Sequence, residues 1–444
     1  MKKLSMFKII LKHTPKYLTA SVVANGVALL MTKYYTSVFT PAEYGILALY
    51  LVMFQYITTL VSLNMDSSAT RFYFDYKDTK RDEYLSTIFW FITALAIVTL
   101  VTGLLFMDFI SNWISPHSDM IYVVTLFTGI GAVYVSFFTR ILYNEHKSTS
   151  VLKHTLFQTF INHASSALFI SLFHLGIFGR MSGQGLGYFL NIFTLLKEFY
   201  KENLFRLKLT FNKAMASETF MLALPSIIAS LQTVVFVYLD RIFIKHYIGD
   251  SAVGVYTLGY MLGQGLSMIY EAVSQAILPK VYNDMNKNYT SAIKELEDFS
   301  YKYYIGLVII TVIIALLSPV IVDLFSTQNY SKAALVMPFV MAGFMMGGFY
   351  KIPSLVLGYH KVVWFYPFLS AFSFGTNALL NWWLIPIYGI VGAGFASFVG
   401  LFLYSSVMQI LSFKYMNKKY SLFVGIGYIV LFIVIFLVFI VSGV

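Results

Sequence analysis

The strongest constraint on this chain is a series of thirteen long apolar stretches, which are separated by short polar segments. Each is close to the roughly 20 apolar residues that an α-helix needs to cross a bilayer. Apolar and polar residues do not alternate over ten-residue units, as they would in an outer-membrane β-barrel. The sequence therefore predicts an all-α, polytopic membrane protein. The predicted spans are 17–39, 44–66, 84–106, 120–142, 155–178, 184–203, 219–243, 253–278, 303–325, 334–357, 362–385, 389–412 and 421–442.

The composition excludes a soluble enzyme of this length. Only 11% of the 444 residues are charged and 58% are hydrophobic, whereas soluble domains average about 25% charged and about 45–50% apolar residues. So few charges cannot solvate the surface of a globule. Cysteine is absent, so disulfides, thiolate metal sites and cysteine nucleophiles are excluded as well.

The basic residues predict the orientation. Of 31 lysines and arginines, 25 fall in segments on one side of the membrane and five on the other, and Lys351 falls inside a span. By the positive-inside rule the N-terminus is cytoplasmic. The net charge of +11 then reflects topology and anionic lipid headgroups rather than nucleic acid. Residues 1–16 are basic and amphipathic, and we expect them to lie on the inner surface.

The two halves of the chain resemble each other at an offset of 209 residues. The matching pairs include Gly45 with Gly254, Gln55 with Gln264, Gly183 with Gly392, and Phe189 with Phe398. The alternative is that membrane helices with short loops look alike. The offset covers six spans, so it predicts parallel repeats, two lobes of six transmembrane helices around a central cavity. The predicted lobes are 17–205 and 206–413, followed by a hydrophobic C-terminal segment, 414–444, with a further helix.

Motifs for bond-making chemistry are missing from the sequence. There is no G-x-x-x-x-G-K-[ST] phosphate loop and no H-E-x-x-H or other metal-ligand cluster, so the chain lacks the usual means of hydrolysing ATP or holding a catalytic metal. The predicted outer loops are too short for a ligand-binding domain. We therefore expect no metal, no cofactor and no enzymatic activity.

Polar residues at membrane depth are costly, so they are candidates for function. Cations near the ends of spans suit an anionic headgroup, although snorkelling to the interface is the alternative. Two asparagines four residues apart share a helix face, and suit either sugar hydroxyls or contacts between helices. The substrate-binding candidates are Lys33, Arg241, Lys351, Arg140, Asn377 and Asn381.

Acidic groups and one histidine are candidates for coupling transport to H⁺ or Na⁺. Glu271 lies about two-thirds of the way inward along the predicted span 253–278, where desolvation would favour its protonated form. Asp240 adjoins Arg241 and is also a candidate partner for that cation. Asp66 lies nearer the inner surface, and His163 would relay protons. For Glu271 the alternative is a structural hydrogen bond to a neighbouring helix, and for His163 it is a bond to sugar hydroxyls or a packing role.

Three motifs resemble those of bacterial polysaccharide-repeat-unit flippases, of the O-antigen and capsule type. These proteins belong to the multidrug/oligosaccharidyl-lipid/polysaccharide exporter superfamily. The resemblance covers residues 15–412. Its motifs are Thr40-Pro41-Ala42-Glu43-Tyr44-Gly45-Ile46 followed by Asp66-Ser67-Ser68-Ala69-Thr70-Arg71-Phe72-Tyr73, then Asp240-Arg241 with Gly249-Asp250-Ser251-Ala252-Val253-Gly254-Val255-Tyr256, and Leu384-Ile385-Pro386-Ile387-Tyr388-Gly389-Ile390-Val391-Gly392-Ala393.

The resemblance implies a transporter in the bacterial inner membrane that works by alternating access. Its substrate would be an oligosaccharide linked by diphosphate to undecaprenol, with cavity cations holding the headgroup. Family members often carry arginine where this chain has Lys33. Membrane lipids, a coupling ion and the polysaccharide polymerase machinery are the implied partners. The alternatives are a cation-coupled multidrug exporter of the same superfamily and, in another class, a membrane glycosyltransferase or ligase.

Overall fold

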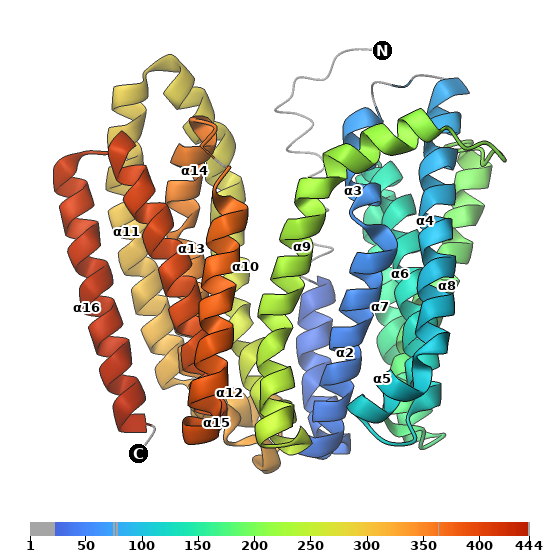
Figure 1. Cartoon of the computed structure of the whole chain (residues 1–444), viewed down its shortest axis with the longest axis horizontal. Helices are drawn as coiled ribbons and strands as arrows, with labels where there is room; N and C mark the ends of the chain where they lie inside the picture. The colour runs from blue at the N-terminus through green and yellow to red at the C-terminus, as the bar shows by residue number, and fades with distance from the viewer. Residues whose placement is uncertain (1–22, 74–75, 77–78, 363, 443–444) are drawn as a thin grey trace. The chain divides into compact units, whose positions relative to one another are not determined.

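All regular structure in the described part of the chain is helical (Figure 1), which confirms the predicted all-α fold. The computed structural model describes residues 23–73, 76, 79–362 and 364–442, so the predicted interfacial segment 1–16 lies outside them. Residues 23–38 form the first helical segment. The following helices are α2 (Pro41–Ser62), α3 (Met65–Phe72), α4 (Thr79–Leu105), α5 (Met107–Ile114), α6 (Asp119–Asn144), α7 (Ser148–Ser171), α8 (Gly176–Glu202), α9 (Lys213–Tyr247), α10 (Asp250–Lys287), α11 (Tyr289–Leu316), α12 (Ser318–Phe325), α13 (Ala333–Phe349), α14 (Lys351–Tyr359), α15 (Tyr366–Ser412) and α16 (Lys418–Ser442).

Within the described residues each predicted span falls on helical structure, but spans 44–66, 155–178, 303–325 and 334–357 each extend over two helices, α2 with α3, α7 with α8, α11 with α12 and α13 with α14. Seven helical stretches in the described residues are long and apolar enough to cross a membrane by length and composition alone. The others carry more polar side chains; α7, for example, contains Gln158, Asn162 and His163. Such residues disfavour contact with lipid and favour packing inside a bundle. The protein is therefore a multi-pass membrane protein.

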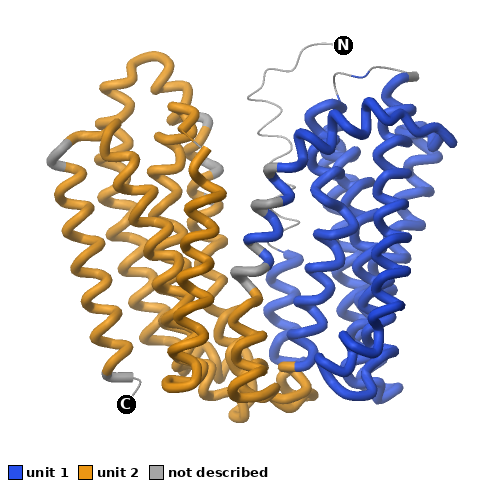
Figure 2. Tube along the Cα trace, in the orientation of Figure 1, with its two compact units in different colours: residues 1–35, 46–234 blue, residues 36–45, 235–444 orange. Residues whose placement is uncertain are grey.

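The chain forms two compact units, which Figure 2 colours separately. Unit 1 comprises residues 46–234 and the described part of 1–35, and unit 2 comprises residues 36–45 and 235–444. The boundary between the units falls inside α9, and the start of α2 belongs to unit 2. The lobe boundary at residues 205 and 206, which came from the repeat, stays a prediction.

Small residues let the helices of unit 1 approach closely. A Cβ atom on Gly183 would lie 2.4 Å from the backbone nitrogen of Ser166, so this glycine allows α8 to pack directly on α7. Small residues at such contacts are typical of helix packing in membranes, where burial from water supplies no driving force. Gly183 is one of the residues that the repeat matches.

Glycines also join the starts of α2 and α10 within unit 2. A Cβ atom on Gly45 would lie 1.9 Å from the carbonyl oxygen of Asp250, and one on Gly254 would lie 2.0 Å from that of Pro41. The two glycines are a matching pair of the repeat. Neither position has room for a side chain without a backbone shift.

The long helix α15 contains two of the predicted spans. Gly389 interrupts it with φ 59° and ψ −141°, a conformation that glycine adopts most easily. Pro386, just before it, has no N–H to continue the helical ladder. The break at Gly389 therefore adjoins residues 386–388, which separate the two predicted spans. The C-terminal α16 packs in the same unit, with Phe439 stacked on Phe395 at 4.1 Å between ring centroids.

Candidate functional site

A break between α2 and α3 opens a polar pocket in unit 1. Leu63 and Asn64 adopt left-handed conformations with φ 39° and 53°, and asparagine tolerates this region better than most residues. The Asn64 amide nitrogen donates hydrogen bonds to Ser230 Oγ at 2.7 Å and to the Ser226 carbonyl at 2.9 Å. The break is thereby tied to the first half of α9.

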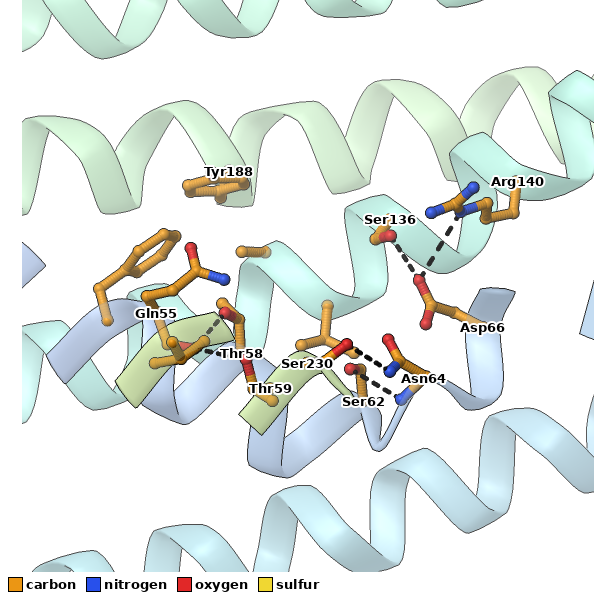
Figure 3. A pocket seen from close by; sticks show the side chains of 14 residues that line it. Gln55, Thr58, Thr59, Ser62, Asn64, Asp66, Ser136, Arg140, Tyr188 and Ser230 are labelled. Carbon is orange, nitrogen blue, oxygen red and sulfur yellow. Dashed lines mark hydrogen bonds and ion pairs between the residues drawn. The ribbon is translucent and has the colours of Figure 1, made fainter. Parts of the chain in front are cut away.

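The pocket has a volume of about 540 Å³, within the roughly 300–1,000 Å³ of small-molecule sites. Figure 3 shows its lining, with Asp66, Ser136 and Arg140 at one end and Gln55 and Tyr188 at the other. Four further residues, Phe54, Ala132, Val133 and Val234, complete the wall. The polar lining residues are Gln55, Thr58, Thr59, Ser62, Asn64, Asp66, Ser136, Arg140, Tyr188 and Ser230.

Charge in this pocket is balanced. Asp66 is 6% exposed, accepts a hydrogen bond from Ser136 Oγ at 2.6 Å, and lies 3.9 Å from Arg140 Nε. These two residues are its one acid and one base, and its other polar groups are hydroxyls and amides. The structure thus brings together a predicted coupling residue and a predicted substrate-binding residue. Such a pocket suits a neutral ligand with many hydroxyl groups.

A second polar centre surrounds Asp240 inside unit 2. Its side chain is fully buried and accepts hydrogen bonds from Asn381 Nδ2 at 2.5 Å, from Ser397 Oγ at 2.6 Å and from the Tyr256 hydroxyl. Asn381 also bonds Asn377 at 3.1 Å. Three neutral donors from α10 and both halves of α15 therefore hold this buried carboxylate.

The chemistry of this centre is that of a site for a proton or a hard cation. Asn381 Oδ1 is buried and has no hydrogen-bond partner among the described residues. Carboxylate and amide oxygens are the ligands that hard cations prefer. The neighbouring Arg241 is 4% exposed, with its guanidinium over the rings of Tyr238, Tyr256 and Tyr260 at 5.2, 5.6 and 4.6 Å. Arg241 is therefore a buried cation inside the unit.

Glu271 and Lys351 form an ion pair between α10 and α14. Lys351 Nζ lies 2.6 Å from Glu271 Oε1, with side-chain exposures of 18% and 45%. The lysine also lies over the rings of Tyr270 and Tyr350. Two residues that the sequence placed in separate roles thus neutralise each other.

The remaining candidates lie in unit 1. His163 Nδ1 is 3.1 Å from the Tyr35 hydroxyl. Arg180, one of the five basic residues that the positive-inside count assigned to the outer side, is 8% exposed; its Nη1 donates to Asn162 Oδ1 at 3.1 Å, and its guanidinium lies over the Tyr35 ring. Lys33, by contrast, is exposed.

The hydroxyl-bearing residues and Gln55 that line this pocket were not among the predicted site residues, because those were selected mainly for their charge. The signal for this lining is nevertheless present in α2. Gln55, Thr58, Thr59 and Ser62 follow the spacing i, i+3, i+4 and i+7 in an otherwise apolar span, which places them on one helix face. A polar stripe of this kind predicts a polar cavity beside the helix.

The fold of this chain is shared with solved structures of membrane flippases and transporters. The structure of the lipid II flippase MurJ, inward closed, has a TM-score of 0.76 and 15% identity, covering 98% of this chain and 96% of that one. An inward-facing multidrug resistance MATE family transporter has a TM-score of 0.69 and 14% identity, covering 89% and 94%. A superfamily transporter from Pyrococcus furiosus, described as having a binding pocket of reverse polarity, has a TM-score of 0.63 and 13% identity, covering 93% and 96%.

The chain belongs to the polysaccharide biosynthesis protein family, whose model matches residues 10–282. No curated protein matches it significantly. The family match and the shared fold bear out the resemblance that the sequence motifs indicated.

Proposed function

We propose that the protein flips a polyprenyl-diphosphate-linked oligosaccharide from the cytoplasmic to the outer leaflet of the bacterial inner membrane. The product would supply the polymerase machinery that builds O-antigen or capsule. The observation that carries the proposal is the charge-balanced, hydroxyl- and amide-lined pocket of unit 1. Hydroxyl groups of sugars match such a lining, and Phe54 and Tyr188, 5.8 Å apart, offer aromatic faces to a sugar ring.

The same pocket argues against the multidrug alternative. An exporter of cationic drugs needs a carboxylate free to pair with its substrate, but Asp66 already has Ser136 and Arg140 as partners. A buried polar lining is also costly for an apolar drug, because its hydrogen bonds would be left unmade. The family assignment likewise favours a saccharide.

Ion coupling and binding of the diphosphate headgroup are assigned to different residues. Asp240, with Asn377 and Asn381, exchanges H⁺ or Na⁺, since its carboxylate is buried among neutral donors. Lys33 is exposed enough to meet the diphosphate, whereas Arg140 stays with Asp66 and Arg241 acts on the Asp240 centre. Lys351 reaches a substrate phosphate only when it leaves Glu271.

Transport is testable in proteoliposomes that contain a fluorescent polyprenyl-diphosphate oligosaccharide and an imposed H⁺ or Na⁺ gradient. We expect the fluorescent glycan to become accessible to a membrane-impermeant quencher faster than in protein-free vesicles. Polyprenyl phosphate without sugar serves as the substrate control and ethidium as the drug control. Ethidium export without glycan flipping would establish the multidrug alternative and refute the proposal.

Replacing Gln55 by leucine should weaken binding of the glycan-linked lipid. The change keeps the side-chain volume but removes an amide from the pocket, and a lost hydrogen bond is worth about 0.5–1.5 kcal/mol, or roughly 2- to 10-fold in apparent KM. The control is Gln264→Leu, because Gln264 is the exposed repeat equivalent of Gln55. Equal KM values for the two variants would remove this pocket from substrate recognition.

A further inference from the structure

The segment that joins α8 to α9 exposes apolar side chains at alternate positions. In this non-helical segment, residues 203–212, Leu207 is 50%, Leu209 90% and Phe211 56% exposed. Arg206 and Lys208 alternate with them. Alternating apolar and basic side chains are suited to the boundary between headgroups and acyl chains, where each kind meets its own environment.

Hydrogen bonds fasten this segment along the first turns of α4. The Lys208 backbone N–H donates to Ser86 Oγ at 2.9 Å, and Trp90 Nε1 donates to the Lys208 carbonyl at 2.8 Å. The Asn212 backbone N–H donates to Thr87 Oγ1 at 3.1 Å. The exposed leucines and phenylalanine are therefore presented by a segment that is held in place.

Beside the segment lies a second pocket, of about 810 Å³, bounded by α4, α6 and α8. Its inner wall is aromatic, with Phe89, Phe138, Phe199 and Phe205, and the rings of Phe138 and Phe199 are 5.1 Å apart. Its rim carries Lys201 and Arg206.

Within the described part of the chain, the side chains of the two rim cations are not paired with an acid, and the Arg206 backbone N–H donates to Asp82 Oδ1 at 3.4 Å. Arg206 Nη2 donates to Asn203 Oδ1 at 3.2 Å, and neither Lys201 nor Arg206 forms an ion pair with a described residue. An apolar cavity with two basic side chains at its mouth complements an anionic amphiphile. Basic pockets at the edges of transmembrane helices commonly bind the headgroups of anionic lipids.

We infer that this pocket binds one anionic phospholipid, with an acyl chain against the four phenylalanines and the phosphate between Lys201 and Arg206. Charge complementarity selects an anionic lipid over a zwitterionic one, and the apolar wall selects a lipid over free phosphate. The site stands apart from the polar pocket of unit 1, so it does not depend on the proposed transport function.

Native mass spectrometry of the purified full-length protein, titrated with phosphatidylglycerol or phosphatidylcholine, tests this site. We expect wild type to bind one phosphatidylglycerol preferentially and the K201Q/R206Q variant to bind it on the order of 30-fold more weakly. The matched control is K197Q/K213Q, which removes two exposed cations outside the pocket. Its affinity should equal that of wild type.

A second variant separates this site from a general loss of charge or folding. Leu196 is a 45% exposed wall residue, so Leu196→Trp should fill the cavity, keep both cations and still weaken phosphatidylglycerol binding. Glycerol phosphate should not compete. Equal phosphatidylglycerol affinity in both double variants, preferential binding of phosphatidylcholine, or competition by glycerol phosphate would each overturn the inference.

Discussion

Replacing Asp240 by asparagine is expected to reduce gradient-driven transport to the rate of protein-free vesicles while the protein still folds. The amide keeps the shape of the side chain, but it cannot bind or release a proton and supplies a much weaker cation ligand. Binding of the lipid-linked glycan should persist, because the proposed substrate pocket lies in unit 1 and Asp240 in unit 2. Flipping in proteoliposomes, with and without an imposed gradient, measures the effect.

The control for Asp240→Asn is Asp298→Asn, which removes one exposed carboxylate from the same unit. Transport by that variant should match wild type. Ser397→Ala keeps the carboxylate and removes one donor to it, so transport should continue with a shifted dependence on pH or Na⁺. Gradient-dependent transport by Asp240→Asn at the wild-type rate would place the coupling site elsewhere.

Gly45→Ala and Gly254→Ala are expected to destabilise the protein most among small substitutions. Each added methyl group would lie within about 2 Å of a carbonyl oxygen and would force the backbones at the starts of α2 and α10 apart. Overpacking of this kind typically costs about 1–3 kcal/mol, and more where backbone must move. A lower midpoint of thermal unfolding in detergent, followed by size-exclusion chromatography, reports the loss.

Gly265→Ala is the matched control for the glycine pair, because Gly265 lies in the same helix as Gly254 and a Cβ atom there meets nothing within 4 Å. Its unfolding midpoint should equal or exceed that of wild type, since alanine favours a helix over glycine. If all three variants unfold at the same temperature, the close approach of α2 and α10 does not limit stability.

The fold was predictable because membrane helices leave a direct mark on the sequence. A run of about 20 apolar residues has few other interpretations, so the described parts of the spans are helical, although α15 joins two spans and four other spans are each divided between two helices. The loop at residues 386–388 was also visible, since proline and glycine interrupt helices for local reasons. Helical spans and helix breaks were predictable because both depend on neighbouring residues in the sequence.

The sites were only partly predictable because they depend on which helices meet. Asp240, Asn377 and Asn381 were singled out, but as parts of different functions, and the hydrogen bonds between them were not foreseen. Likewise the sequence gives no sign that Lys351 pairs with Glu271. Sequence periodicity shows on which face of a helix a residue lies. Which other helix packs against that face depends on the tertiary structure, which the periodicity does not reveal. These functional roles remain proposals.

The reciprocal contact at the starts of α2 and α10 bears on how such a chain could arise. Pro41 and Asp250 are related by the same offset of 209 as Gly45 and Gly254, and each glycine lies against the carbonyl of the other segment's partner residue. Gly45 contacts Asp250, and their repeat equivalents, Gly254 and Pro41, make the same contact in reverse. A two-fold homodimer interface has this reciprocal pattern. We infer that an ancestral protein half this length formed this contact between two identical copies. Duplication and fusion of its gene then placed both copies in one chain. Both glycines would then descend from a single ancestral position, already constrained by self-association.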